Sequence, residues 1–398
     1  MKTYLVTGAA GFIGANFVKY MLKKHTDIKI VILDKLTYAG NLGTIKDEIK
    51  DERVEFFKGD ICNIELVENI FTKNEIDYVI NFAAESHVDR SIENPRIFLE
   101  TNILGTQTLL DAAKKNWSIG KDKNGYPIYK KDKKFHHVST DEVYGSLKKD
   151  YDKPIELKLD MKVKKIVEDR KNLQTYGTEM FTEKTPLDPR SPYSSAKASS
   201  DMIVMAYGET YHFPFNITRC SNNYGPYHFP EKLIPLIIKN ILGGKKLPVY
   251  GKGDNVRDWL YVEDHCKAID MVVSNGIPGE IYNVGGFNEE KNINIVKLTI
   301  DSILNLMKKN IEYQQVLKTD LKNINYDLIT YVGDRLGHDA RYAIDPTKIV
   351  TELGWYPETP FTEGIEKTII WYLENQDWVD SVVSGDYQKY YDEMYGKR

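Results

Sequence analysis

The chain has 398 residues, of which 41% are hydrophobic and 28% are charged, a composition typical of folded globular proteins and unlike that of disordered or fibrous ones. A chain of this length suits two associated lobes better than one compact unit. Its formal charge of -4 creates no general basic field, so nucleic acid is not expected as a partner.

Short β-branched runs alternate with longer amphipathic runs along the first part of the chain. The expected strands are 4–7, 29–34, 54–60, 78–84 and 135–140, and the expected helices are 12–24, 65–72 and 95–115. This alternation is typical of βαβ units, which build parallel sheets. We therefore expect an α/β fold with a Rossmann-type, doubly wound parallel sheet.

The alternation changes in the second half of the chain. A helix over 193–211 and a strand over 215–221 continue it, but beyond Asn222 Pro and Gly punctuate short strands such as 247–250 and 281–284. We expect a Rossmann domain over 1–215, to which the chain returns near 255–285, and a smaller mixed α/β domain over 216–398 for substrate. The lysine-rich segments 114–134 and 148–171 are expected as solvated loops or short helices outside the core.

The segment TGAAGFIG places Gly8, Gly11 and Gly14 between the first strand and the first helix. Backbone N–H groups and the helix dipole can then face a pyrophosphate without obstruction by side chains. Asp34 closes the second strand, where a carboxylate can accept hydrogen bonds from an adenosine ribose and would repel a 2'-phosphate. NAD is therefore expected rather than NADP, and Asp60 is expected at the adenine. An ordinary glycine turn and a loop-capping Asp60 are the alternatives.

The segment SPYSSAK predicts the start of a helix on which Tyr193 and Lys197 share one face. A phenol ordinarily ionises near pH 10, but an adjacent ammonium group and an oxidised nicotinamide would both favour phenolate, giving a base for a sugar hydroxyl. Thr140, Asp141 and Glu142 end the strand 135–140, at the sheet edge where ligands bind. Crowding of the two carboxyls should raise one pKa and divide acid and base roles between them. A surface Tyr-Lys pair and a capping Asp-Glu pair are the alternatives.

The three cysteines, Cys62, Cys220 and Cys266, are far apart, and the sequence has no CxxC or HExxH spacing. Neither a disulfide framework nor a metal site is expected. We find no signal peptide and no apolar run long enough for a bilayer, so no membrane partner is expected and the predicted location is cytoplasmic.

Seven motifs in order resemble those of the dTDP-glucose 4,6-dehydratases, which are extended short-chain dehydrogenases/reductases of the NAD-dependent epimerase/dehydratase family. The motifs are TGAAGFIG, AAESHVDRS, STDEVYG, SPYSSAK, SNNYGPYHFPEKLIP, PVYGKGDNVRDWLYVEDH and DRLGHDARYAID. The resemblance spans nearly the whole chain. It implies a lyase of deoxysugar biosynthesis, with oxidation at carbon 4, elimination of water across carbons 5 and 6, and return of hydride to carbon 6.

The resemblance also implies residue roles. Tyr193 would be the oxidation base supported by Lys197, Thr140 would bond the carbon 4 oxygen, Glu142 would take the carbon 5 proton, and Asp141 would protonate the leaving hydroxyl. The residues implied for NAD, beyond the three glycines, are Phe12, Ile13, Asp34, Lys35, Leu36, Thr37, Asp60, Ile61, Ala83, Ala84, Thr101, Tyr193, Lys197 and Asn223. The residues implied for the nucleotide sugar are Ser86, Thr140, Asn222, Lys232, Leu233, Pro248, Tyr250, Arg257, Asn292, Arg335, His338 and Tyr387.

Lys232, Arg257 and Arg335 also make chemical sense as diphosphate partners in a net acidic protein. His87 and His338 are assigned no catalytic role. The family resemblance further implies a homodimer joined through helices 95–115 and 193–211. Segments 148–171 and 310–327 look longer than is usual in the family, and Leu336 stands where proline is common.

Two other functions remain as alternatives. An epimerase or dehydratase acting on another nucleotide sugar, such as UDP-glucose, would share the glycine turn and the Tyr-Lys pair, but an epimerase normally lacks adjacent carboxylates after Thr140. A non-catalytic NAD-binding regulator would keep the fold without the activity. The choice between thymidine and uridine follows from the resemblance alone.

Overall fold

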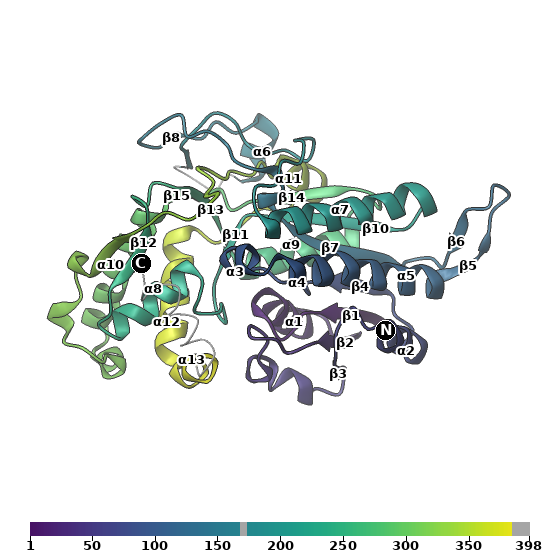
Figure 1. Cartoon of the computed structure of the whole chain (residues 1–398), viewed down its shortest axis with the longest axis horizontal. Helices are drawn as coiled ribbons and strands as arrows, with labels where there is room; N and C mark the ends of the chain where they lie inside the picture. Colours follow the sequence, from purple (N-terminus) through teal and green to yellow (C-terminus); the bar gives the residue numbers. More distant parts are fainter. Residues whose placement is uncertain (168–172, 384–398) are drawn as a thin grey trace.

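The computed structural model describes residues 1–167 and 173–383. Its centre is a seven-stranded sheet of order β14-β10-β7-β4-β1-β2-β3, in which every pairing is parallel (Figure 1). These strands are β1 (Lys2–Thr7), β2 (Ile28–Asp34), β3 (Val54–Lys58), β4 (Tyr78–Asn81), β7 (Lys134–Thr140), β10 (Phe215–Cys220) and β14 (Ile281–Val284). The predicted doubly wound α/β fold is confirmed.

Helices cover both faces of this sheet, as its apolar strands require. On one face, α1 (Phe12–Lys24) and α9 (Val262–Asn275) pack against each other and share a core with β1 and β2. The other face carries α2 (Ile64–Lys73), α5 (Thr106–Trp117) and α7 (Pro192–Tyr211). The carboxyl ends of β1, β4 and β7 therefore lie at the same edge of the sheet, where ligands bind in such folds.

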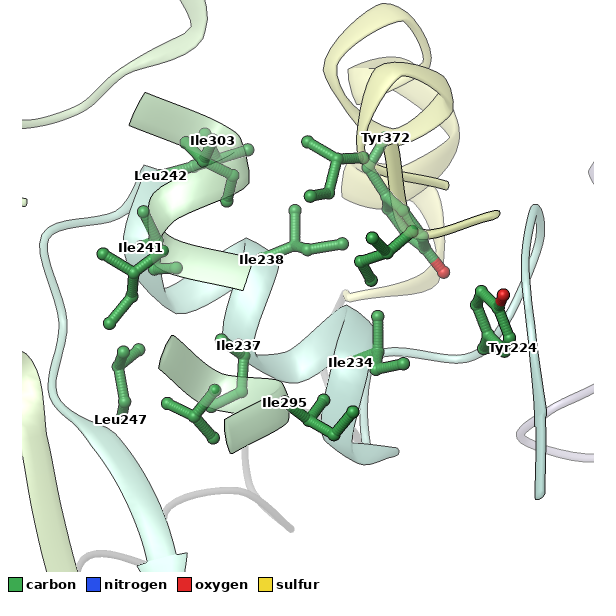
Figure 2. Close-up of a cluster of buried hydrophobic side chains, with 14 of the residues drawn as sticks. Tyr224, Ile234, Ile237, Ile238, Ile241, Leu242, Leu247, Ile295, Ile303 and Tyr372 are labelled. Carbon is green, nitrogen blue, oxygen red and sulfur yellow. The ribbon is translucent and has the colours of Figure 1, made fainter. Parts of the chain in front are cut away.

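A second lobe lies beside the sheet, on the left in Figure 1. Its strands are β11 (Asn222–Tyr224), β13 (Val256–Tyr261), β15 (Glu289–Lys291), β12 (Leu247–Tyr250) and β16 (Ile329–Val332), and its main helices are α8 (Leu233–Leu242), α10 (Asn292–Lys309) and α12 (Phe361–Glu374). Ile234, Ile237 and Ile241 of α8 meet Ile295 and Ile303 of α10 in its core (Figure 2). This lobe has an apolar core of its own.

The remaining elements are short. They are α3 (Val88–Glu93), α4 (Pro95–Leu99), α6 (Met161–Ile166), α11 (Thr347–Leu353), α13 (Gln376–Val382), β5 (Ser118–Lys121), β6 (Pro127–Tyr129), β8 (Ile155–Glu156), β9 (Gln174–Thr175), the 3-10 turns η1 (Leu42–Ile45), η2 (Glu48–Lys50), η4 (Asp141–Tyr144), η5 (Ile311–Val316), η6 (Leu321–Asn323) and η7 (Tyr326–Leu328), and the π-helical turn η3 (Glu100–Gly105). The long segment 310–327 thus folds into single turns.

The lysine-rich segment 114–134 was expected as a solvated loop or short helix outside the core; most of residues 119–132 are indeed exposed or half-buried, but the expected secondary structure was wrong. Strands β5 and β6 form an antiparallel hairpin that projects from the body at the right of Figure 1. The Asp122 carboxylate accepts hydrogen bonds from the backbone N–H groups of Asn124 and Tyr126, at 2.8 and 2.9 Å, and Gly125 has φ +90°. Asp122 and the pair Asn124-Gly125 favour such a tight turn.

The segment 148–171 was expected to lie outside the core, and this too was wrong in part. Val163 of α6 and Val167 are buried in a cluster with Tyr282 and Val284 of β14. Asp160 begins α6 by accepting a hydrogen bond from the N–H of Lys162. Residues 168–171 lie outside the described residues. The insertion therefore extends the apolar packing beside the sheet edge.

The expected helix 95–115 is interrupted by the π-helical turn η3. Within it, the Asn102 side chain bonds the Glu85 peptide twice, accepting from its N–H at 2.9 Å and donating to its carbonyl at 3.0 Å. Such turns often occur at functional sites. Within the described ranges, every helix is too short or too polar to cross a lipid bilayer.

Candidate active site

The turn after β1 and the first turn of α1 each admit only glycine at one position. Gly8 has φ +68°, and a Cβ there would lie 2.7 Å from the Ala83 nitrogen. A Cβ on Gly14 would lie 2.4 Å from the Gly8 carbonyl oxygen. Helix α1 begins after Gly11, and among the described residues no side chain caps its first turn. Its N–H groups are thus available to an anion, and the turn fits a pyrophosphate.

Asp34, at the end of β2, is held by the backbone. Its Oδ2 accepts a hydrogen bond from the N–H of Ala10 and its Oδ1 from that of Leu36, both at 2.8 Å. Burial raises the pKa of Asp34, and these two hydrogen bonds oppose the shift. Nearby, the Lys35 ammonium lies 2.6 Å from Asp60 Oδ2. The two carboxyls predicted to meet adenosine therefore stand at one end of a cavity.

This cavity of about 360 Å³ runs along the strand ends and against the second lobe. It is lined by the glycine turn, by Thr140 and Glu142, and by Tyr193 and Lys197. The residues predicted for NAD that line it are Gly8, Gly11, Phe12, Ile13, Gly14, Asp34, Lys35, Thr37, Asp60, Ile61, Ala83, Ala84, Thr101, Tyr193, Lys197 and Asn223. Of that predicted set, Leu36 alone is not in the cavity wall; its backbone binds Asp34 instead.

Local capping positions the catalytic candidates. Ser191 begins α7 through a capping box: its Oγ accepts from the N–H of Ser194, while Ser194 Oγ accepts from the N–H of Ser191. Tyr193 and Lys197 follow on the first two turns of α7, and both are buried. Thr140 Oγ1 caps η4 by accepting from the Glu142 N–H at 3.3 Å and donates to Asp141 Oδ1 at 3.3 Å.

The two adjacent carboxyls differ in surroundings. Burial raises the pKa of Asp141 well above its ordinary value, and the charges of Glu142 and Asp258 add to the shift. Burial also raises the pKa of Glu142, but Arg335, Lys232 and Arg257 oppose that rise. Asp141 therefore favours its protonated form more than Glu142 does. This agrees with the division into acid and base expected from the sequence, with burial as the main cause.

The pKa of Tyr193 moves opposite to the expectation. Burial raises it well above the ordinary value and Glu142 raises it further, whereas a hydrogen bond with Thr140 lowers it. Burial disfavours the charged form of Lys197 too, and it lowers the pKa of this ammonium group to about 8. The Lys197 ammonium donates to the Val138 carbonyl at 2.7 Å. In the protein alone, desolvation outweighs the help expected from Lys197, so a phenolate needs a further positive charge.

Comparison with known proteins places the chain in a family. Residues 4–285 match the model of the NAD dependent epimerase/dehydratase family. The chain belongs to this family. It is 48% identical over 394 residues to the dTDP-glucose 4,6-dehydratase of Shigella flexneri, with 99% of each chain covered. The family resemblance predicted from the motifs is thereby confirmed.

Solved structures of family members agree. The dTDP-glucose 4,6-dehydratase of Bacillus anthracis in complex with NAD is 42% identical, with a TM-score of 0.75 over 96% of this chain and 100% of that one. The enzyme of that name from Streptomyces venezuelae, also solved with NAD, is 38% identical, with a TM-score of 0.77 over 96% and 99%. The glycine turn, the uncapped start of α1 and Asp34 fit such a dinucleotide, and NAD is the family's cofactor.

The residues predicted for the nucleotide sugar fall into two groups. Ser86, Thr140, Asn222, Lys232 and Leu233 line the cavity, whereas Pro248, Tyr250, Arg257, Asn292, Arg335 and His338 do not. Asp141, predicted as catalytic, is likewise buried behind the wall. Tyr387 lies outside the described residues. Among the residues described, Asn222 Oδ1, Asn292 Oδ1 and Arg335 Nε are buried and have no hydrogen-bond partner, as expected of groups that await a ligand.

Arg257 is already engaged. Its guanidinium donates to the carbonyls of Val256 at 2.7 Å and Asp339 at 3.0 Å, and it lies 4.0 Å from the Tyr342 ring centre. His338 Nδ1 lies 2.6 Å from Asp334 Oδ1. These contacts hold the DRLGHD segment against the second lobe. Arg257 still lies close enough to act on the pKa of Glu142.

The sequence-based list missed several residues of the cavity wall. Glu85, Ser221, His228, Glu231 and Trp259 all line it. Each belongs to a motif that carried the family resemblance, so the motifs held the signal. What was missing was the direction of each side chain, which depends on the turns that follow β4 and β10. The His228 ring stacks on Phe12 at 4.1 Å and joins the second lobe to α1.

Proposed function

We propose that this chain dehydrates dTDP-glucose to dTDP-4-keto-6-deoxyglucose with NAD as its cofactor. The observation that carries the proposal is the pair of adjacent carboxyls: Glu142 lines the cavity with Tyr193 and Lys197, and Asp141 is buried next to it in the chain. An epimerase acting at one carbon requires no acid and base for elimination. The full-length similarity to dTDP-glucose 4,6-dehydratases supports the same conclusion.

NAD would be held by the glycine turn, by Asp34 and Asp60 at the adenosine, and by Thr101 and Asn223 further along the cavity. The remaining proposed contacts are Phe12, Ile13, Lys35, Leu36, Thr37, Ile61, Ala83, Ala84, Tyr193 and Lys197. The chemistry that NAD supplies when bound is acceptance of a hydride and its later return. The chain itself has to move protons and exclude water.

Tyr193 acts as the base that removes the proton of the carbon 4 hydroxyl. Thr140, which bonds Tyr193, orients that hydroxyl, and the Lys197 ammonium favours the phenolate. Because the chain's own burial raises the pKa of Tyr193, the positive charge of oxidised nicotinamide is needed to bring it into a useful range.

Elimination then uses the two carboxyls. The carbon 4 ketone acidifies the hydrogen on carbon 5, and Glu142 removes it as a proton. Asp141, kept protonated by burial, gives its proton to the departing carbon 6 hydroxyl, which leaves as water. The cations that oppose the raised pKa of Glu142 are Arg335, Lys232 and Arg257. A diphosphate bound by them would offset their charge and make Glu142 a stronger base.

The nucleotide sugar would be held by these cations together with Ser86, Thr140, Asn222, Leu233, Pro248, Tyr250, Asn292, His338 and Tyr387. We further propose that residues 1–215 form the NAD domain, with a return near 255–285, and that 216–398 form the substrate domain. Helix α9 and strand β14 support that return, because α9 packs on the central sheet and β14 joins it. Strand β10 also belongs to the central sheet, so the boundary near residue 215 falls at the start of this strand.

We also propose a homodimer joined through the face formed by α4, η3, α5 and α7. This face exposes Leu99, Leu104 and Met202 at 46%, 55% and 53%. Large apolar side chains gathered on neighbouring helices are typical of a subunit interface. A cytoplasmic location is proposed as well, since all three cysteines are free thiols, which a reducing compartment maintains.

The test is incubation of purified protein with dTDP-glucose and, separately, UDP-glucose, followed by mass spectrometry of the nucleotide sugars. We expect loss of one water from dTDP-glucose without net consumption of NAD, and a much slower reaction of UDP-glucose. Binding of both substrates without loss of water from either would overturn the proposal.

A further inference from the structure

Lys197 has a polar network on its inner side. Its Nζ lies 3.3 Å from His137 Nε2. The same imidazole nitrogen lies 3.6 Å from Asp201 Oδ1, and Asp201 Oδ2 accepts a hydrogen bond from Arg219 Nε at 2.8 Å. All four residues are buried, with exposures of 4% or less. A chain of contacts therefore links the Lys197 ammonium to a carboxylate that does not line the cavity.

The fold fixes this arrangement from three elements. Asp201 lies one helical turn after Lys197 on α7, so both face the sheet. His137 comes from β7 and Arg219 from β10, and these strands pair in parallel, with Ile217 opposite His137 and Arg219 opposite Ser139. The His137 Nε2 atom thus lies close to both the Lys197 ammonium and the Asp201 carboxylate. Among the described residues Asp201 Oδ1 has no hydrogen-bond partner, so the carboxylate acts on the ammonium through its charge.

The charges explain why a carboxylate is needed there. Burial lowers the pKa of Lys197 to about 8, and Asp201 is the first of the groups that oppose this shift, followed by Cys220 of β10. Burial and Lys197 together keep the pKa of His137 well below its ordinary value, so the imidazole is neutral. Of the other charged groups around the network, Arg219 lies on the far side of Asp201, and Tyr193 precedes Lys197 on α7.

We propose that Asp201, acting across His137, is a positioning residue that keeps the Lys197 side chain charged and fixed at the cavity. The inference concerns the site of the proposed function and rests on it for its consequence in catalysis. The competing explanation is that Asp201 serves only to neutralise buried Arg219. If Asp201 acts on Lys197, removal of its carboxylate lowers the pKa of Lys197. If Asp201 only neutralises Arg219, the pKa of Lys197 stays the same.

The experiment measures the protonation of Lys197 directly. The full-length protein is labelled with trace acetic anhydride across a pH series, and the extent of labelling at Lys197 is followed by peptide mass spectrometry. In Asp201→Asn we expect the labelling midpoint to fall by about one pH unit, because a nearby anion has been lost. Dehydration at pH 8 should fall about fivefold through the smaller ammonium fraction, with little change in KM.

Two further variants make the result decisive. Asp201→Asn leaves the Arg219 charge without its carboxylate partner and is prone to misfold. The double variant Asp201→Asn/Arg219→Met removes both charges and should show a smaller fall in the same direction, because Arg219 is farther from Lys197 and loss of its positive charge opposes the shift. Ser200→Ala is the matched control, since Ser200 Oγ lies 3.1 Å from the same His137 nitrogen but carries no charge, and its midpoint should not move. An unchanged Lys197 midpoint in either folded Asp201 variant would overturn the proposal. The labelling result does not depend on which sugar nucleotide is turned over, so failure of the proposed function would be seen separately.

Discussion

The substitution Gly14→Ala tests the phosphate turn most sharply. The added Cβ would lie 2.4 Å from the Gly8 carbonyl oxygen and 2.9 Å from the Ala9 Cα. Both are backbone atoms, so no side chain can rotate away and the turn itself must move. Overpacking of this kind costs about 1–3 kcal/mol. If NAD binding to the displaced turn is weakened by the same free energy, the affinity for NAD falls roughly 5- to 150-fold.

The assay is titration of NAD into the purified variant, followed by intrinsic tryptophan fluorescence, to which Trp259 in the cavity wall contributes, alongside thermal unfolding. Gly333→Ala is the matched control, because among the described residues nothing lies within 4 Å of its added Cβ. The control should bind NAD as the unaltered protein does. Equal NAD affinity and equal Tm in the two variants would refute the steric argument for Gly14.

Three other predictions follow from the described contacts. Asp141→Asn, which keeps the shape but cannot donate the proton, should lower product formation about 10²- to 10⁴-fold with NAD binding retained; product assays and NAD titration check this. Burial lowers the pKa of Lys134 from 10.5 to about 8. Below pH 8 the buried ammonium destabilises the folded state. This destabilisation disappears as the pH rises from 8 to 10.5, because Lys134 is then neutral in the folded state but still charged in the unfolded state. The destabilisation caused by Lys134→Met should therefore grow between pH 7 and 9.5, by up to about 1.4 kcal/mol per pH unit above pH 8, as measured by urea unfolding. Leu104→Asp should convert the proposed dimer to monomer in analytical ultracentrifugation while Ile311→Asp, at a side chain 75% exposed on the other lobe, should not; a monomeric unaltered protein would contradict this.

The central sheet was predictable because its signals are local. Helix α1 and strand β14 have the predicted bounds, as does β12 of the second lobe, since each combines a clear hydrophobic pattern with a glycine, proline or polar boundary. The π-helical turn η3 was not predictable. It depends on Asn102 bonding the Glu85 peptide, a contact between residues whose proximity only the fold creates.

Prediction of the candidate site from the sequence has the same limit, because it too depends on contacts that only the fold creates. The glycine turn, the Tyr-Lys pair and the family resemblance identified most of the residues that meet at the cavity, because the ends of parallel strands share one edge, but six of the residues predicted for the sugar do not line it. The sequence-based prediction misjudged the pKa of Tyr193, since the degree of burial outweighs the neighbouring charge. It also treated 148–171 as solvated, although Val163 and Val167 are buried. Composition alone does not reveal which apolar side chains of a lysine-rich segment find a partner.

The central claim is that one bound sugar is oxidised, then dehydrated, then reduced. The hydride removed in the oxidation is the one returned in the reduction, and it never leaves the site. The most direct test uses dTDP-glucose carrying deuterium at carbon 4, with the product analysed by mass spectrometry and NMR. We predict loss of one water and recovery of the deuterium at carbon 6. A product that keeps its water, or that loses water but carries no deuterium at carbon 6, would contradict the account.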